Sequence, residues 1–368
     1  MPTILDLFSG CGGLALGTKN AGFTTALAID IDPILSSSFP TNFPGTTFLQ
    51  ADISSLTSAQ LDELLPHGVD GIVGGPPCQA FSGIGRRLPD DPRRDLVGEF
   101  FRIVKVVNPT FFLMENVPGL GFPENRPILD SAIKTLGKKW KVLEPVILDA
   151  ADYGAPTKRK RIFVFGFNIS KMQPPSLAEV IESNSKRTTV KDAIGDLASI
   201  PVSEENLLEY IDYINISDYA KKMRSPTEVF TGHKITKHRP ETVARFAKIP
   251  QGGVDPVGKH KRLSWIGLCP TLRAGTGSDR GSYQAVRPLH PEQNRVISPR
   301  EAARLQGFPD NFIFHPTVWH SFRMIGNSVS PIIAEALLKN IKKYLPTSST
   351  NAETDSKHKK SKFELDIA

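Results

Sequence analysis

The stretch TILDLFSGCGGLALG, residues 3–17, joins a short apolar run to a glycine-rich loop and then to a second apolar run. Its first part, 3–8, has the length and the β-branched content of a buried strand. Gly10, Gly12 and Gly13 let the backbone turn sharply and approach a ligand closely. A strand, a tight loop and a helix in this order predict the first unit of a parallel α/β sheet.

The same pattern continues along the first 170 residues, where short apolar runs alternate with amphipathic stretches. These runs indicate buried strands, because they are rich in β-branched and aromatic residues and end in Gly, Asp or Asn. The further predicted strands occupy 24–30, 46–52, 70–75, 110–116, 140–150 and 161–167. Helical periodicity lies between them at 59–65 and 98–107. Alternating strands and helices predict a doubly wound, mostly parallel, Rossmann-like α/β domain.

After about residue 170 the periodicity weakens, and proline and glycine become frequent. This composition predicts a smaller, irregular second domain, with a helix at 299–308 that starts on a proline. Residues 330–345 form an amphipathic helical pattern without a local partner, so we expect this helix to pack back on the first domain. The predicted division is 1–170 with 320–345 for the first domain, 171–319 for the second, and a disordered tail at 346–368.

Positive charge is concentrated in one part of the chain. The net charge is +7, and residues 221–300 hold sixteen Lys and Arg against five Asp and Glu, so this segment carries +11 and the remainder −4. A solvated basic surface is one explanation. A nucleic-acid footprint is the other, since phosphate backbones attract clustered Lys and Arg.

Composition and cysteine content exclude several classes of protein. Of 368 residues, 39% are hydrophobic and 23% are charged, as in ordinary globular proteins. No apolar run reaches the roughly 18 residues of a membrane span, and the N-terminus lacks the basic flank of a signal peptide. Cys11, Cys78 and Cys269 cannot form a disulfide framework and lack the spacing of a zinc site. We therefore expect a reducing, cytoplasmic setting and no metal.

Acidic residues follow two of the predicted strands at positions suited to a nucleoside. Asp30 ends the second strand about 20 residues after the glycine loop, where a carboxylate can accept hydrogen bonds from ribose hydroxyls. Asp52 ends the third strand. Because ligands of open α/β sheets bind outside the carboxyl ends of the strands, these residues converge on one adenosine-sized site. The loose G-x-G-x-x-A pattern of the loop leaves open whether the adenosine belongs to NAD or to another cofactor.

The stretch GGPPCQAFSG, residues 74–83, sets Cys78 just after the fourth predicted strand. A cysteine beside a cofactor site is placed for covalent catalysis. Glu115 ends the next strand, where a carboxylate either caps the following helix or activates a substrate. Arg159 and Arg161 alternate at the start of the last predicted strand, so we expect both on one face. There they can hold an anionic or carbonyl-bearing substrate.

With these residues in place, the chain resembles the cytosine-5 DNA methyltransferase family, except in the middle of the second domain and in the tail. Six motifs follow the family's order: DLFSGCGG (6–13), GGPPCQAFSG (74–83), ENV (115–117), DYGAPTKRKRIF (152–163), SPREAARLQGFPDNF (298–312) and GNSVSP (326–331). Thr157 departs from the family pattern, which usually has glutamine there, and Asp30 stands where glutamate is frequent. The resemblance implies a methyltransferase fold with S-adenosyl-L-methionine as cofactor.

The resemblance also implies a covalent mechanism on cytosine. The Cys78 thiolate would add to carbon 6 of the ring, while Glu115 holds or protonates its N3 edge. Carbon 5 would then accept the methyl group of S-adenosyl-L-methionine, and loss of the carbon 5 proton would expel Cys78. Arg161 and Arg159 would contact the carbonyl of the base or a nearby phosphate. Positive charge near the thiol should assist its ionisation.

By the same resemblance, residues from both ends of the chain line the cofactor pocket. Asp30 would bind the ribose and Asp52 the adenine amino group, with Phe8 and Ile31 packed on the adenine ring. The remaining implied cofactor residues are Gly10, Gly13, Ile53, Pro77, Leu96, Asn327 and Ser328.

Two arginine-rich stretches are expected to bind DNA. The target carbon is inaccessible in a stacked duplex, so an enzyme of this family flips the base out. Residues 79–95 resemble the family's mobile lid, and the basic domain at 171–319, with residues 269–288 within it, resembles its target recognition domain. Arginine can contact phosphates or read guanine bidentately. The implied DNA-binding residues are Arg86, Arg87, Arg93, Arg94, Thr271, Leu272, Arg273, Arg280 and Arg287.

The resulting hypothesis is a sequence-specific, monomeric DNA (cytosine-5-)-methyltransferase of the prokaryotic cytoplasm. It would act on double-stranded DNA as the modification half of a restriction system, with a companion restriction endonuclease. Cys11 and Cys269 are interpreted as structural, because they have no surroundings comparable to those of Cys78.

Three alternatives stay open. A branch of the family methylates transfer RNA with the same motifs. A catalytically inactive nucleic-acid-binding module would need only the basic domain. An NAD-dependent oxidoreductase would use the glycine loop, but it would leave Cys78 and Glu115 unexplained.

Overall fold

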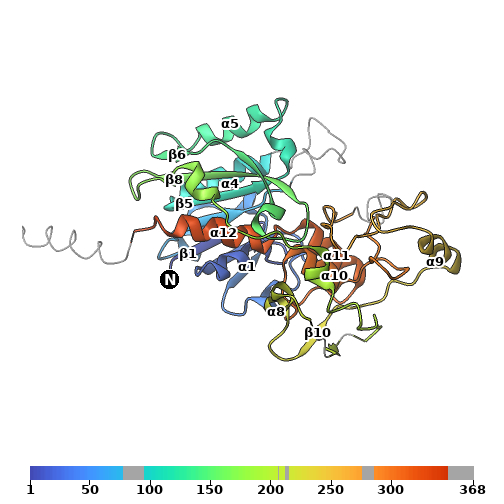
Figure 1. The fold of residues 1–368 in the computed structure, drawn as a ribbon. Helices are drawn as coiled ribbons and strands as arrows, with labels where there is room; N and C mark the ends of the chain where they lie inside the picture. Colours follow the sequence, from blue (N-terminus) through green and yellow to red (C-terminus); the bar gives the residue numbers. More distant parts are fainter. Residues whose placement is uncertain (78–94, 206, 212–214, 276–285, 347–368) are drawn as a thin grey trace, which may run out of the picture.

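The computed structural model describes residues 1–77, 95–205, 207–211, 215–275 and 286–346. Its centre is an eight-stranded sheet (Figure 1). The strands are β1 Thr3–Leu7, β2 Thr24–Asp30, β3 Thr47–Gln50, β4 Gly71–Gly74, β5 Phe111–Asn116, β6 Trp140–Val142, β7 Val146–Asp149 and β8 Lys160–Asn168. Across the sheet the order is β3-β2-β1-β4-β5-β8-β6, with β7 also paired to β8.

The strand directions place the chain in the doubly wound α/β class. All neighbours from β3 to β5 are parallel, whereas β6, β7 and β8 pair antiparallel at the far side. The chain leaves β1 for β2 and β3 on one side and continues with β4 and β5 on the other. Strand order therefore reverses between β1 and β4, where doubly wound sheets bind ligands. The predicted mostly parallel α/β fold is confirmed.

Helices cover both faces of this sheet. The helices are α1 Gly13–Asn20, α2 Phe39–Asn42, α3 Ser58–Leu64, α4 Asp95–Val107, α5 Arg126–Lys134, α6 Leu177–Ile181, α7 Val190–Ile194, α8 Asp218–Met223, α9 Pro240–Ala247, α10 Pro299–Gln306, α11 Val318–Asn327 and α12 Pro331–Lys342, with 3-10 turns η1 Ile53–Ser55, η3 Pro118–Gly121 and η4 Ala150–Tyr153. Alternate side chains of β5 separate two cores: Phe112 packs with α3, α4 and α5, and Leu113 packs with α1 and α12.

The last helix lies alongside the first, as the red α12 beside the blue α1 shows in Figure 1. Gly17 permits this close approach, because a Cβ there would lie 2.4 Å from the Cβ of Ala334. Leu337 and Ile341 of α12 share a buried cluster with Leu14 of α1. The prediction that the final helix packs back on the first domain is confirmed.

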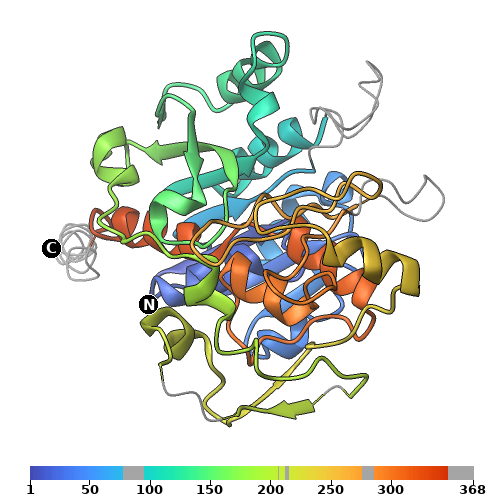
Figure 2. The same ribbon diagram turned by 45° about the vertical axis from the view of Figure 1, so that its right-hand side comes forward.

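The chain after β8 is mostly irregular, with one small sheet made of β9 Leu207–Glu209 and β10 Val229–Thr231. A buried cluster joins this part to the N-terminal segment, since Phe39 and Phe43 pack with Phe308, Phe312 and Ile325. Figure 2 shows the orange α10–α11 region lying against the blue segment. This hydrophobic core contains residues from inside and from outside 171–319. The division of the chain into two domains at these bounds therefore stays a prediction.

Three smaller predictions concern the helix at 299–308, membrane-spanning helices and the C-terminal tail. α10 confirms the helix expected at 299–308, with a capping box between Ser298 and Glu301 and a left-handed Gly307 at its end. No helix in the described ranges is long and apolar enough to cross a membrane. The tail predicted to be disordered, 346–368, lies outside the described residues from 347 onward.

Candidate active site

The carboxyl end of β5 lies beside the first residues of β8, because these two strands are antiparallel. Glu115 is opposite Phe163 and Asn116 is opposite Ile162, so Arg161 reaches the same edge of the sheet as Glu115. β1, β2 and β4 end at this edge too, since they run parallel to β5. The topology therefore brings together the predicted residues at these strand ends.

Glu115 and Arg161 form a buried ion pair at this edge. Nε of Arg161 lies 2.9 Å from Oε1 of Glu115, and the two side chains keep only 15% and 10% of their surface exposed. Burial raises the pKa of Glu115 above its usual value, and the charges of Arg161 and Arg159 offset only part of this effect. A carboxyl group with a raised pKa at a strand end is suited to carry a proton in a reaction.

The segment that follows β4 lies against this carboxylate. A Cβ on Gly75 would lie only 3.2 Å from Oε2 of Glu115, so glycine leaves the carboxylate its room. Nδ2 of Asn116 donates a hydrogen bond of 3.1 Å to the carbonyl of Pro76. The end of β5 therefore fixes the backbone at Pro76, in the proline pair that follows the neighbouring strand β4.

Several predicted site residues lie outside the described ranges. Pro77 is half-buried at the end of its described segment, directly before Cys78 in the sequence. The residues that the structure does not describe are the predicted nucleophile Cys78, the predicted lid arginines Arg86, Arg87, Arg93 and Arg94, and Arg280. Their roles stay predictions.

The glycine loop has left-handed backbone at Phe8, Gly10 and Gly12, where φ is 57°, 52° and 99°. Asp30 braces this loop, because its Oδ2 accepts a 2.7 Å hydrogen bond from the Gly10 N–H and its Oδ1 accepts one of 2.8 Å from the Asp32 N–H. Burial raises the pKa of Asp30, although these hydrogen bonds act to lower it. Each carboxylate oxygen keeps a lone pair that a ribose hydroxyl can use.

The C-terminal GNS motif contacts the glycine loop. A Cβ on Gly13 would lie 2.6 Å from Oγ of Ser328, and Sγ of Cys11 lies 3.3 Å from the same oxygen. Asn327, the preceding residue, is exposed at the end of α11. The structure thus brings together predicted cofactor residues that are about 315 positions apart in the sequence.

The other predicted cofactor residues follow β2 and β3 or begin α4. Ile31 is 61% exposed and directly follows Asp30. Asp52 accepts a hydrogen bond of 2.9 Å from the Ser54 N–H and caps η1. Ile53 is buried and Leu96 is half-buried, and both belong to the core beside α4. An exposed apolar side chain next to an acidic one suits a flat ring joined to a ribose.

Arg159 and Arg161 have different partners. Arg159 is 2% exposed, and its Nη1 donates to the Leu272 carbonyl at 3.3 Å while Nη2 donates to the Gly326 carbonyl at 2.9 Å. Arg161 instead pairs with Glu115. Because both arginines act to lower the pKa of Glu115, both lie near the predicted site, and Nε of Arg161 lies 2.9 Å from its carboxylate.

The predicted recognition segment begins beside β8. Thr271 is exposed, and its hydroxyl donates a hydrogen bond of 2.6 Å to the Lys158 carbonyl. Leu272 is 4% exposed and packs in the core, whereas Arg273 is exposed. Thr271 and Leu272 therefore dock this segment on the sheet, and Arg273 is the described side chain of the three that projects freely to solvent.

Arg287 lies against an aromatic side chain. Its guanidinium carbon is 4.1 Å from the centre of the Phe322 ring, a cation–π contact. Burial lowers the pKa of Arg287 to about 10. The predicted DNA-binding role of Arg287 is untested, and in this arrangement its guanidinium covers α11.

Asp6 is a buried acidic residue that sequence reasoning missed. It is fully buried in β1, and burial first and the charge of Asp30 next raise its pKa well above the usual value, against a lowering effect from the backbone of Ala15. The signal was present in TILDLF, where one carboxylate interrupts an apolar strand. Asp6 adds a second carboxyl group beneath the loop that Asp30 braces.

The two described cysteines are buried, which agrees with their interpretation as structural residues. Cys11 is 2% exposed and Cys269 is fully buried, and burial raises the pKa of each thiol to about 12. Thr157, the departure from the family pattern, is also buried, and its hydroxyl donates to the Cys269 carbonyl at 3.2 Å. The substituted position thus keeps a defined contact.

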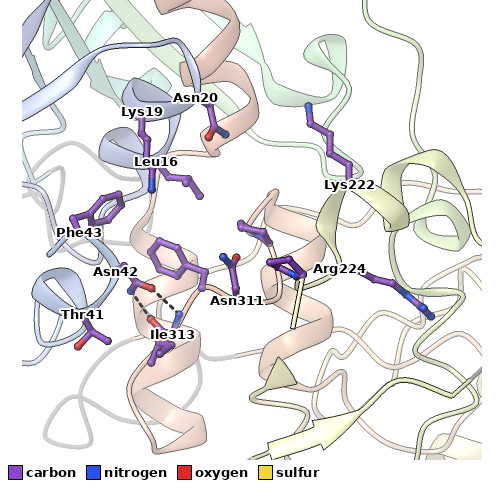
Figure 3. Close-up of a pocket in the computed structure, with 13 residues that line it drawn as sticks. Leu16, Lys19, Asn20, Thr41, Asn42, Phe43, Lys222, Arg224, Asn311 and Ile313 are labelled. Atoms are coloured by element: carbon purple, nitrogen blue, oxygen red, sulfur yellow. Dashed lines mark hydrogen bonds between the residues drawn. The ribbon is translucent and has the colours of Figure 1, made fainter. Parts of the chain in front are cut away.

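A cavity of about 430 Å³ lies away from the sheet edge (Figure 3). Its wall includes Lys19 of α1 and Asn311, and at its rim the Asn42 amide exchanges hydrogen bonds with the backbone of Ile313. No predicted site residue lines it.

The part of the chain that the structure describes contains no group of three His, Cys, Asp or Glu side chains that could hold a metal ion.

Known proteins resemble the chain over most of its length. A family model described as C-5 cytosine-specific DNA methylase matches residues 2–343. The Type II methyltransferase M.XorII of Xanthomonas oryzae pv. oryzae is 40% identical over 94% of this chain and 85% of its own length. The Type II methyltransferase M.DdeI of Desulfomicrobium norvegicum is 33% identical over 93% and 88%. The crystal structure of a protein described as a DNA modification methyltransferase from an E. coli prophage has a TM-score of 0.82 and 36% identity, covering 93% of this chain and 99% of that one.

Proposed function

The chain belongs to the C-5 cytosine-specific DNA methylase family, and we propose that it transfers a methyl group from S-adenosyl-L-methionine to carbon 5 of a flipped-out cytosine in double-stranded DNA. The observation that best supports this proposal is the buried pair of Glu115 and Arg161, 2.9 Å apart at the carboxyl edge of the sheet. Gly75 lies against the Glu115 carboxylate of this pair, and Cys78 follows three residues later in the sequence.

In the proposed mechanism, the Cys78 thiolate bonds to carbon 6 of cytosine. Glu115 carries a proton toward N3, so that charge does not build up on the ring, and its raised pKa favours the protonated form that can donate. Arg161 holds this carboxyl group in place and faces the base. After methylation, a proton acceptor removes the proton from carbon 5 of the cytosine. The electrons of that bond re-form the double bond between carbons 5 and 6, and the Cys78 sulfur leaves from carbon 6.

The residues around the glycine loop fit S-adenosyl-L-methionine, which supplies an electrophilic methyl group when bound. Asp30 offers a ribose its remaining lone pairs, and the exposed Ile31 offers an apolar surface to adenine. Phe8 would cover the ring from the loop, and Asp52 would accept from its amino group. Gly13 brings the loop against Ser328, so that the GNS motif closes the site from the other side.

The irregular part of the chain, 171–319, is proposed as the target recognition domain, and residues 79–95 as the lid over a flipped base. Arg273 is the described candidate for a direct contact with DNA, since it is exposed next to the docked Leu272. The description of the matching family as a DNA methylase supports duplex DNA as the substrate. Contacts by the lid arginines would make the affinity salt-dependent.

The names of the relatives support a biological setting. M.XorII and M.DdeI are both Type II methyltransferases. We propose by analogy that this chain is a monomeric, sequence-specific modification enzyme that protects a site from a companion restriction endonuclease. Bisulfite sequencing of DNA from cells that express the chain would identify the methylated cytosine.

Replacement of the proposed nucleophile tests the mechanism directly. We expect Cys78→Ser to lower the turnover of labelled methyl transfer by about 10³-fold or more, because the covalent step is lost. Affinity for S-adenosylhomocysteine should stay within about twofold of the wild-type value. A Cys78→Ser variant that methylates at the normal rate would overturn the covalent mechanism.

The matched control is Cys269→Ala, which removes a buried thiol but keeps the backbone hydrogen bonds of Cys269 to Pro156 and Lys158, so turnover should stay near normal. Duplex DNA and transfer RNA are assayed side by side with the wild-type chain. Methylation of transfer RNA alone would favour the other branch of the family. Tight DNA binding without any methyl transfer would favour a binding module instead.

A further inference from the structure

Three backbone segments meet at Arg159. The first is the approach to β8, residues 156–159. The second is the start of the predicted recognition segment, residues 269–275, which pairs with the first: the Cys269 N–H donates to the Pro156 carbonyl at 2.9 Å, and the Lys158 N–H donates to the Cys269 carbonyl at 2.8 Å. The third is the GNS motif, residues 326–328, at the end of α11. These segments carry the predicted substrate arginines, the start of the DNA-reading region and the predicted cofactor residues.

The Arg159 side chain joins the second and third segments. One arm of its guanidinium donates to the Leu272 carbonyl at 3.3 Å, and the other donates to the Gly326 carbonyl at 2.9 Å. The side chain is 2% exposed, so these bonds form away from competing water. A planar fork with donors on both arms can hold two backbones at once, whereas the single ammonium of lysine cannot reproduce that geometry.

The second and third segments also touch directly. A Cβ on Gly326 would lie 2.5 Å from the Ala274 nitrogen and 2.6 Å from the carbonyl carbon of Arg273. The contact leaves no space between the two backbones, so a shift of one must move the other. On the far side of Gly326, Ser328 contacts Gly13 of the glycine loop.

We propose that Arg159 is a positioning residue that couples DNA binding at the recognition segment, 269–275, to cofactor binding at the GNS segment, 326–328. This inference rests on the proposed function. A ligand that orders either segment also orders the shared junction, so the second ligand binds to a site that is already arranged and binds more tightly. The effect is reciprocal, because coupling between two sites is a single free energy.

The test measures the dissociation constant of S-adenosylhomocysteine with and without an excess of duplex DNA that carries the methylated site. For the wild-type chain we expect the duplex to tighten binding by about fivefold or more. For Arg159→Lys we expect a ratio within about twofold of one, and because the ratio divides by the affinity measured without DNA, it reports the coupling whether or not that affinity changes. The reverse measurement, DNA affinity with and without S-adenosylhomocysteine, must give the same ratio.

The matched control is Arg262→Lys. Arg262 is 3% exposed, and its two arms also donate to backbone carbonyls, among them those of His290 and Phe246. It lies in the predicted recognition domain but contacts neither coupled segment through these bonds. We expect Arg262→Lys to lower stability as much as Arg159→Lys does, yet to keep the wild-type coupling ratio.

A second variant serves if Arg159→Lys does not fold. Gly326→Ala keeps the helical backbone of α11 but forces apart the two segments that touch, so the coupling ratio should fall toward one. If Arg159→Lys shows the wild-type coupling ratio, the proposal is overturned. The same holds for Gly326→Ala where it replaces Arg159→Lys. A wild-type chain that methylates DNA but shows a ratio of one would also overturn it and leave the proposed function intact. Absence of methyl transfer by the wild-type chain would contradict the function itself.

Discussion

Two buried glutamates of this protein, Glu115 and Glu301, each lie beside an arginine, yet their pKa values move in opposite directions. Glu115 is 7% exposed and its pKa is raised, whereas Glu301 is fully buried and its pKa is lowered well below the usual range. Burial acts to raise the pKa of both carboxyl groups. The difference must therefore come from the partners that each carboxylate has.

Glu301 is held by a complete set of donors. Arg295 bonds both of its oxygens at 2.8 Å, and the Ser298 N–H donates to Oε2 at 2.7 Å. The charge and hydrogen bonds of Arg295 outweigh the effect of burial. Among the described residues, Glu115 is paired with Nε of Arg161 at 2.9 Å, and a Cβ on Gly75 would lie 3.2 Å from its second oxygen.

The comparison separates a structural carboxylate from one that is suited to chemistry. A buried carboxylate with all its hydrogen bonds made stabilises one arrangement and stays ionised. A buried carboxylate with few bonds holds a proton more readily than a solvated one does, which suits general acid–base catalysis. The same residue type thus fixes the start of α10 in one place and is available for a reaction in the other.

The largest expected effect separates the two glutamates by activity. Glu115→Gln should lower the turnover of methyl transfer by about 10² to 10⁴-fold, because an amide cannot deliver a proton to the ring. It should change the free energy of unfolding less than Glu301→Gln does, since the amide oxygen can still accept from Arg161. Steady-state methylation and urea unfolding measure the two effects. Normal turnover in Glu115→Gln would remove the distinction drawn here.

The next effect is on stability. Glu301→Gln should lower the free energy of unfolding by about 3 kcal/mol, because it leaves the buried charge of Arg295 without its partner. Turnover per folded molecule should stay near the wild-type value, since Glu301 lies in α10 and touches no proposed site residue through its hydrogen bonds. An urea midpoint equal to that of the wild type would contradict the assignment of Glu301 as a structural carboxylate.

The sequence predicted the carboxyl edge of the sheet better than the junctions between distant segments. Short apolar runs that end in Gly, Asp or Asn predicted the sheet, and the alternation of Arg159 and Arg161 predicted that both lie on one face, where both lower the pKa of Glu115. These inferences succeed because strand direction and a period of two are local properties. Asp6 belonged to the same local pattern and was overlooked.

The partners of individual arginines could not be predicted in this way. Arg159 donates to carbonyls 113 and 167 positions away, and Arg287 stacks on Phe322, a contact that depends on how α11 packs. Backbone carbonyls carry no sequence signal, and every arginine has the same donors. An arginine motif therefore predicts a site, while the folded chain decides which of its members reaches the reacting groups.

The smallest effect is in the pH dependence of stability, and its sign differs between the two glutamates. The pKa of Glu301 in the folded state lies below the usual 4.5, so its contribution is present above pH 4.5 and is lost as the pH falls through the lowered pKa. The pKa of Glu115 lies above 4.5, so its contribution is present below pH 4.5 and is lost as the pH rises through the raised pKa.

Urea unfolding between about pH 3 and pH 8 tests this difference. As the pH rises, the destabilisation caused by Glu301→Gln should grow, whereas that caused by Glu115→Gln should shrink. Each substitution replaces one titrating carboxyl group with a neutral amide, so the two slopes compare the two glutamates in their own surroundings. If both variants showed the same sign of slope, the hydrogen bonds of Glu301 would not outweigh its burial, and the two carboxylates would not differ in kind.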